Sequence, residues 1–188
     1  MSFLVISTSL NPNSQSALLA NEAYIYTLSK KKESTLIDLR DYDLPFCNGH
    51  EQSCYEDPAV LEIHTKIEQV QGVLIASPIH NYGVAASCKN LFELTSHSHK
   101  NILSGTCWQN KVVAYMGFSG SPRSLLAPFP FLNAMFIDAS IILTPPIFMA
   151  SREDMSDGGL KSASLERAHA TIDRWHTLTE QMTHKKKG

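Results

Sequence analysis

The sequence has no long apolar run and no strong excess of charge of either sign. Nowhere in its 188 residues do 18 apolar residues follow one another, so we expect no segment that crosses a bilayer. The 16 basic and 18 acidic side chains leave a formal net charge of −2, which is too weak to favour an anionic or cationic macromolecule. We therefore expect neither nucleic acid nor a membrane surface among its partners.

Cysteine is also scarce. The four cysteines stand at positions 47, 54, 88 and 107, and no two of them form a Cys-x-x-Cys pair. The opening "MSFLVIS" has a short apolar stretch with no basic segment before it, so we expect a first strand rather than a signal peptide, reduced thiols and a cytoplasmic location. Cys47, His50 and Cys54 are all side-chain types that bind zinc. A fourth ligand and compact spacing are missing, so we expect no metal.

Apolar runs and helical patterns alternate along the chain. Hydrophobic residues make up 43% of it and charged residues 18%, which suits a single domain over residues 1–188 with a sizeable core. The periodicities predict strands at 3–6, 35–39, 72–76, 112–116 and 140–143, the last continuing toward 149, and helices at 14–28, 57–70, 86–95, 124–137 and 165–182. Strands this apolar, each followed by a helix, predict a three-layer α/β fold with a five-stranded parallel sheet. We expect the apolar stripe of the last helix to be core.

Three of the loops that follow strands are rich in polar and small residues. They read "STSLNPNSQS" at 7–16, "SPIHNYG" at 77–83 and "GFSGS" at 117–121, whereas the loops after the second and fifth strands lack this composition. In an open parallel sheet, ligands bind beyond the carboxyl ends of the strands, where the strand order reverses. In the order 2-1-3-4-5 the three strands concerned are neighbours, so their loops are predicted to share one crevice.

The first of these loops has the composition of an anion site but none of the standard motifs. It holds neither Gly-x-x-x-x-Gly-Lys-Ser/Thr nor Gly-x-Gly-x-x-Gly, and it contains no Lys or Arg. It leads into a helix, and the start of a helix offers unpaired N–H groups to a phosphate. Two interpretations remain open: a monoester phosphate bound by neutral donors, or serines and asparagines that only cap and turn the chain.

The segment "SPIHNYGVAASCKN" at 77–90 resembles the Ser-Pro-x-Tyr-Asn-x-x-x-Pro-Gly-x-Leu-Lys-Asn signature of the NADPH-dependent FMN reductase family. The matching residues are Ser77, Pro78, Asn81, Lys89 and Asn90. In the first loop, Ser9 and Ser14 resemble that family's Gly-Ser-x-Arg-x-x-Ser phosphate loop. The departures from the two motifs include Thr8 for Gly, Asn11 for Arg, His80 for Tyr and Ala85-Ala86 for Pro-Gly.

The resemblance implies a flavodoxin-like fold with bound FMN, near the interface of a homodimer or homotetramer. The residues implied to hold the phosphate are Ser9, Asn11, Ser14, Gln15 and Ser16. Those implied to lie along the flavin ring are Pro78, Ile79, His80, Asn81, Tyr82 and Gly83. Those implied to form the opposite wall are Gly117, Phe118, Ser119 and Gly120, with glycine allowing close approach of the backbone. No catalytic side chain is implied, because the cofactor carries the redox chemistry.

The expected function is therefore hydride transfer from NADPH or NADH, through FMN, to a small-molecule acceptor such as free flavin, a quinone or an azo dye. Two alternatives remain. One is a flavin-binding electron carrier or redox regulator without its own turnover. The other is a non-redox α/β enzyme that uses the serine-rich loop for a sugar phosphate.

Overall fold

The computed structural model describes residues 1–50, 52–96, 107–157 and 159–184. Its helices are α1 (Gln15–Ser29), α2 (Gln52–Tyr55), α3 (Pro58–Gln69), α4 (Ala86–Thr95), α5 (Phe129–Ala139) and α6 (Ser162–His184). Its strands are β1 (Ser2–Ser7), β2 (Glu33–Asp38), β3 (Gly72–His80), β4 (Gly83–Val84), β5 (Val112–Ser119), β6 (Ile142–Leu143), β7 (Phe148–Ser151), β8 (Met155–Ser156) and β9 (Gly159–Leu160). Short 3-10 turns occupy η1 (Leu39–Asp41), η2 (Pro122–Ser124) and η3 (Arg152–Asp154).

The sheet has the predicted strand order but more strands than predicted. Its path is β2-β1-β3-β5-β6, and these neighbours run parallel. The predicted fifth strand is divided into β6 and β7, which both pair with β5. Pro145 and Pro146 stand between the two and have no N–H to donate to a ladder, so pairing stops there. The short β4 turns back antiparallel on β3, so the sheet has seven strands and is not wholly parallel.

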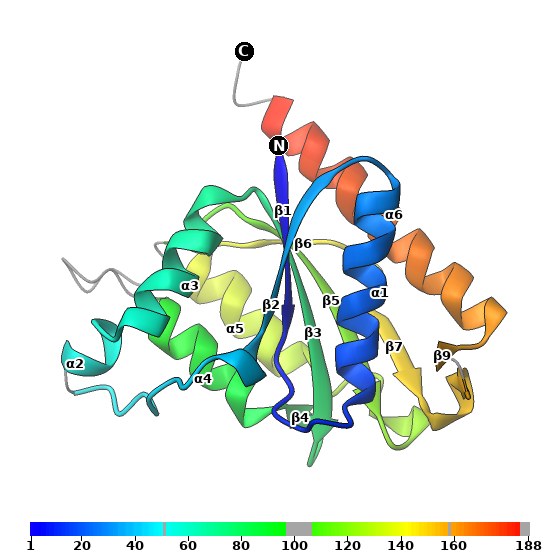
Figure 1. Cartoon of the computed structure of the whole chain (residues 1–188), viewed down its shortest axis with the longest axis horizontal. Coiled ribbons are helices and arrows are strands. Elements are labelled where there is room, and N and C mark those ends of the chain that lie inside the picture. The colour runs from blue at the N-terminus through cyan, green and yellow to red at the C-terminus, as the bar shows by residue number, and fades with distance from the viewer. Residues whose placement is uncertain (51, 97–106, 158, 185–188) are drawn as a thin grey trace.

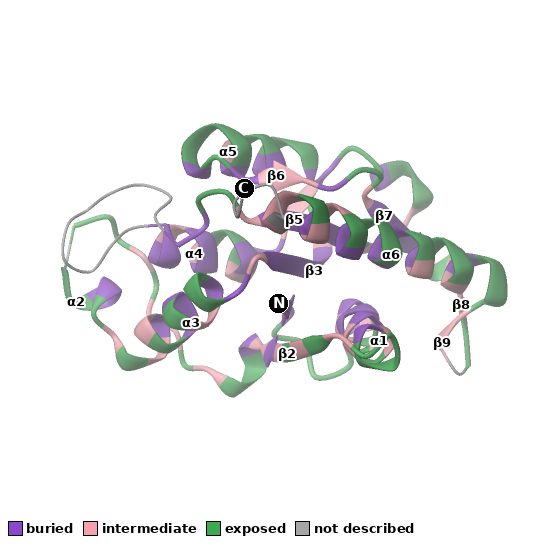
Figure 2. Cartoon of the chain, turned by 90° about the horizontal axis from the view of Figure 1, so that it is seen from above, coloured by how far each residue is buried: buried purple, intermediate pink, exposed green. Residues whose placement is uncertain are grey.

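Helices cover both faces of the sheet, as expected for three layers. Figures 1 and 2 place α3, α4 and α5 over one face and α1 and α6 over the other. The first face buries side chains such as Ile67, Phe92 and Leu132, and the second buries Leu19 and Trp175. The central strands β1, β3 and β5 are buried over most of their length, which explains why they read as continuous apolar runs.

Local sequence signals place the starts of the helices. Ser14 and Asp57 cap α1 and α3 with their side chains, and Pro58 stands in the first turn of α3. The helix predicted at 124–137 begins only at Phe129. The reason is Pro130, which a helix tolerates in its first turn but not in its interior.

The stripe along α6 is core, as predicted. Trp175 is fully buried, its Nε1–H donates to the carbonyl oxygen of Val112 at 3.0 Å, and its ring meets Phe3 edge to face at 4.9 Å between centroids. Ala168 and Ile172 are also fully buried. Within the described residues, no helix is both long enough and apolar enough to span a bilayer.

Candidate functional site

The three polar loops leave the sheet side by side at its carboxyl edge, the lower edge in Figure 1, because β3 lies between β1 and β5. Thr8 ties the first loop to β3: its backbone N–H and its hydroxyl both donate to the carbonyl oxygen of Ala76, at 2.9 and 3.1 Å. The hydroxyl of Ser87, in the first turn of α4, donates to the carbonyl oxygen of Thr8. The first loop is therefore held against the end of β3 and the start of α4.

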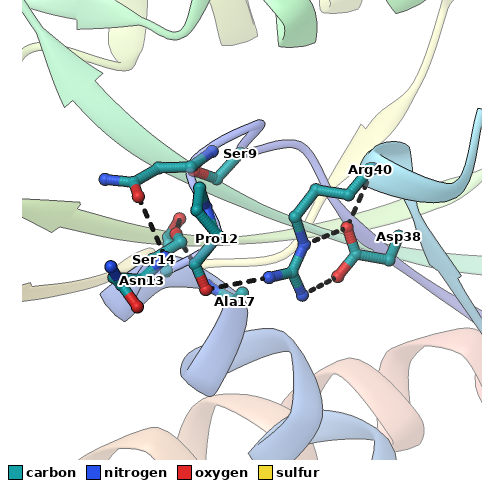
Figure 3. A network of polar contacts seen from close by, with 9 residues as sticks. Ser9, Pro12, Asn13, Ser14, Ala17, Asp38 and Arg40 are labelled. Atoms are coloured by element: carbon teal, nitrogen blue, oxygen red, sulfur yellow. Dashed lines mark hydrogen bonds and ion pairs between the residues drawn. The ribbon is translucent and has the colours of Figure 1, made fainter. Parts of the chain in front are cut away.

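The first loop is shaped by its own short polar side chains (Figure 3). The N–H of Asn11 donates to Ser9 Oγ at 3.3 Å, and the N–H of Asn13 donates to Asn11 Oδ1 at 2.9 Å. Such bonds bend the chain without help from glycine. They show that Asn11, which stands where the family motif has Arg, helps to shape the bend.

The loop ends at the start of α1 in a pair of serine hydroxyls. Ser14 accepts the N–H of Ala17 at 3.2 Å, and its hydroxyl lies 2.9 Å from that of Ser16. The first N–H groups of the helix have no partner within it, and its first turn carries no acidic residue. We call Ser9, Asn11, Ser14, Gln15 and Ser16 the α1 cradle. It offers neutral donors and a helix dipole suited to an anion.

An arginine from another element reaches this loop, which the sequence analysis did not foresee. Arg40 Nη1 donates to the carbonyl oxygen of Pro12 at 3.1 Å, and its Nε donates to Asp38 Oδ1 at 2.9 Å (Figure 3). Burial by itself would raise the pKa of Asp38, but the hydrogen bonds from Arg40 outweigh it and hold that pKa below its usual value. The carboxylate offsets the arginine charge, so Arg40 braces the loop more than it supplies free positive charge.

The second loop is a β-hairpin. Ile79 pairs with Val84 and His80 with Gly83, and the two residues between them, Asn81 and Tyr82, have φ angles of 49° and 61°. Two successive residues with positive φ are typical of a type I′ turn, which usually places Gly second. A tyrosine there is strained, and strain of this kind is often kept at functional sites.

The hairpin exposes only part of the segment predicted to contact a ring. Pro78 is buried and Ile79 packs against the core beneath α4, whereas His80, Asn81 and Tyr82 are exposed. The hydroxyl of Tyr82 donates to the carbonyl oxygen of Arg123 at 3.3 Å, which joins the hairpin to η2, directly after the third loop. The groups that this segment presents to a ligand are therefore those of the turn.

In the third loop, Gly117 is closely packed. A Cβ added at this position would lie 2.8 Å from Cε of Met149, so a larger residue would require the Met149 side chain to move. Phe118 packs toward the core beneath α1 and α6, and Ser119 is buried with its hydroxyl donating to the carbonyl oxygen of Ser121. Gly120 is exposed, and no atom lies within 4 Å of a Cβ added there.

A buried thiol lies beneath the loops. Cys88 is 2% exposed. Burial raises the pKa of Cys88 to about 12, and the neighbouring hydroxyls of Thr8 and Ser77 offset only part of that rise. The thiol is protonated at neutral pH and gives the site no nucleophile.

Two hollows flank the first loop. One, of about 470 Å³, is bordered by residues 12–15 of the loop and by Asp38 and Arg40. The other, of about 290 Å³, is mostly apolar and lies between Leu10, the segment after β2 and the start of α4. Its lining includes Tyr42, Leu44, Phe46 and Asn90. Sequence reasoning missed this second hollow because the segment after β2 lacks the polar composition of the other loops.

Residues 1–148 match the family described as NADPH-dependent FMN reductase. The chain belongs to this family. A stretch of 63 residues is 35% identical to an NAD(P)H-dependent FAD/FMN reductase of Geobacillus thermodenitrificans, and the match covers 32% of each chain. The chain thus spans about a third of that curated relative.

Solved structures support the fold. The chain resembles the NAD(P)H:acceptor oxidoreductase FerB of Paracoccus denitrificans with a TM-score of 0.76 at 18% identity, covering 96% of this chain and 98% of that one. It resembles the apo form of an NADH:FMN oxidoreductase with a TM-score of 0.75 at 18% identity, covering 93% and 87%. A flavodoxin from the domain Archaea gives a TM-score of 0.63 at 14% identity, covering 98% and 100%. The predicted flavodoxin-like fold is confirmed.

The donor set of this family member fits an FMN phosphate. The α1 cradle combines three serine hydroxyls, side-chain amides and the first turn of a helix, and the nearby carboxylate of Asp38 is already paired with Arg40. Among the described residues, no three metal-ligating side chains come together as a metal site, and Cys47 and His50 are not part of such a group. The cradle is therefore suited to an anion held by neutral donors.

The strained turn yields a stability prediction. Replacing Tyr82 with glycine should raise the free energy of unfolding by about 0.5–1 kcal/mol, because glycine adopts positive φ without the steric cost that tyrosine bears. Tyr82→Phe keeps the strain and loses only the bond to Arg123, so it should not stabilise. Urea titrations of the three proteins make the comparison. A Tyr82→Gly protein less stable than Tyr82→Phe would show that the turn carries no strain.

Proposed function

We propose that this protein is an FMN-dependent oxidoreductase that passes hydride from NADPH or NADH to a small acceptor such as free flavin, a quinone or an azo compound. The observation that carries the proposal is the α1 cradle tied through Thr8 and Ser87 to the end of β3 and the start of α4. Family membership over residues 1–148 supports the choice of cofactor.

In this proposal each loop has a separate task. The α1 cradle binds the phosphate through Ser9, Asn11, Ser14, Gln15 and Ser16. The exposed turn formed by His80, Asn81 and Tyr82 lies along one side of the ring, and Gly120 leaves room for the ring edge. Pro78 and Ile79 support the turn from below, while Gly83, Gly117, Phe118 and Ser119 set the backbone path of the two loops.

The chemistry belongs to the cofactor, since bound FMN accepts and then donates a hydride. The protein supplies position and electrostatics. The cap residue of α4, Ala85, makes no side-chain capping bond, so the first N–H groups of α4 remain available near the turn. Their partial positive charge would stabilise negative charge that develops on a reduced ring.

The decisive experiment is a visible spectrum of the purified protein. We expect either a copurifying yellow ligand or a perturbed flavin spectrum on adding FMN at micromolar protein. NADPH should then be consumed in steady state when a quinone is present. Flavin binding without turnover would favour an electron carrier or redox regulator. The absence of any flavin binding would end the proposal and favour a sugar-phosphate enzyme.

We also propose that the protein acts as a homodimer or homotetramer. Supporting evidence comes from large apolar side chains that are exposed on and beside α5, namely Leu125, Leu126, Phe129, Phe136 and Ile137. Three of them, Leu125, Leu126 and Phe129, line one hollow, and exposed apolar patches are typical of protein interfaces. Light scattering coupled to gel filtration should give a mass of two or four times 20.9 kDa. A monomer at micromolar concentration would contradict this assignment.

A further inference from the structure

Two of the four cysteines lie together in a cluster away from the α1 cradle. Cys47 stands in the segment between η1 and α2, and Cys54 lies within α2. Both belong to a small cluster with Tyr55, Val60 and Leu94. Cys47 packs against the cluster that contains Cys54, and its Sγ lies 3.4 Å from the hydroxyl of Tyr55, the residue next to Cys54.

The two thiols differ in access. Cys47 is half-buried, whereas Cys54 is only 6% exposed. Cysteines that react with oxidants are accessible to solvent and often stand next to a resolving cysteine. The other two cysteines are different, because Cys88 and Cys107 are 2% and 1% exposed and belong to the main core.

We propose that Cys47 and Cys54 form a reversible intramolecular disulfide, with hydrogen peroxide as the oxidant. The thiolate of Cys47 attacks one peroxide oxygen, the O–O bond breaks, and hydroxide leaves and is protonated to water. The sulfur of Cys54 then attacks the resulting sulfenic acid, the S–S bond forms, and a second water leaves with the thiol proton. Two thiols are oxidised, and one peroxide is reduced to two waters.

The segment that carries Cys47 is tied to the border of the apolar hollow. The side chain of Asn90 accepts the N–H of Cys47 at 2.8 Å and donates to the carbonyl oxygen of Pro45 at 2.9 Å. Asn90 and Phe46 line that hollow together with Leu10 of the first loop. Disulfide formation therefore joins α2 to a wall of the hollow, and it does so whether or not the protein binds flavin.

The chain provides a direct test by mass. Trypsin cleaves after Arg40 and Lys66, so both thiols fall in one peptide, residues 41–66, with no other cysteine. After treatment of the full-length protein with peroxide and alkylation, we expect this peptide to lack both alkyl groups and to weigh about 2 Da less than its dithiol form. Dithiothreitol should restore both thiols. The peptides with Cys88 and Cys107 should stay alkylatable after unfolding and act as internal controls.

Serine variants assign the two roles. Cys54→Ser should trap a sulfenic acid at Cys47 that dimedone labels, and Cys47→Ser should leave Cys54 unoxidised. If either variant fails to fold, the mass of the wild-type peptide still shows whether the disulfide forms. Peroxide that yields a sulfinic acid at Cys47 with Cys54 still alkylated, or a disulfide between two chains, would overturn the proposal.

Discussion

Replacing Ser14 with aspartate should weaken FMN binding by at least about 100-fold while leaving the fold intact. Aspartate caps a helix as well as serine does, and its charge suits the positive end of the α1 dipole, so stability should not fall. The same charge faces the dianionic phosphate. At about 4 Å and an effective dielectric constant of about 20, repulsion of two unit charges is about 4 kcal/mol, of which salt removes part. Fluorescence quenching of FMN on titration with protein measures the affinity.

Ser14→Asn is the matched control. Asparagine also caps a helix but carries no charge, so this variant should keep FMN affinity within about tenfold of the wild type. Ser16 is a poorer choice for a charge, because it is 1% exposed and an aspartate there would also disturb the fold. Equal affinities for Ser14→Asp and Ser14→Asn would place the phosphate away from the α1 cradle.

The second large effect is loss of stability in mild acid through His176. Its ring is 3% exposed and packs against Phe3, with Nε2 3.1 Å from the hydroxyl of Thr27. That hydroxyl already donates to the carbonyl oxygen of Ala23 at 2.7 Å, so it accepts from His176 and places the ring proton on Nε2. Nδ1 has no hydrogen-bond partner among the described residues. Protonating Nδ1 would therefore bury an unpaired charge.

Burial, followed by the positive charge of Lys32, lowers the pKa of His176 to about 4. The unfolded chain has a histidine pKa of about 6.5 and so binds the proton first. The contribution of neutral His176 to the free energy of unfolding is therefore fully present above about pH 6.5. It is lost as the pH drops toward 4, and the total loss is about 3 kcal/mol. Asp173 and Glu180 also face the ring and reduce the shift without reversing it.

Urea titrations between pH 4 and 7 measure this effect. His176→Gln cannot titrate but can still donate to Thr27, so its stability should depend much less on pH in this range. His169→Gln is the control on the same helix, and it should keep the wild-type slope because His176 is still present. A His176→Gln protein with an unchanged slope would assign the acid sensitivity to other groups.

The comparison of sequence and structure is most informative at the carboxyl edge of the sheet. The three loops were predictable because polar residues directly after buried strands have no packing reason to be there. The contact of Arg40 with the first loop was not predictable, although Arg40 follows β2 by two residues and β2 ends beside that loop. A single side chain that reaches a loop from another element leaves no periodic pattern in the sequence. The reason for glycine at position 117 was equally hidden, because only packing reveals that Met149 occupies the space beside it.

The order and type of the main elements, the caps at Ser14 and Asp57 and the family motif at 77–90 are local properties, so the sequence by itself determined them. Tertiary structure decided the strained turn at Asn81 and Tyr82, the brace from Arg40 and the packing of Met149 beside Gly117. These features depend on contacts between segments distant along the chain or on packing constraints that force unusual backbone angles. The spacing of apolar residues predicts which face of a helix or strand is buried, but it does not predict which other element packs against that face.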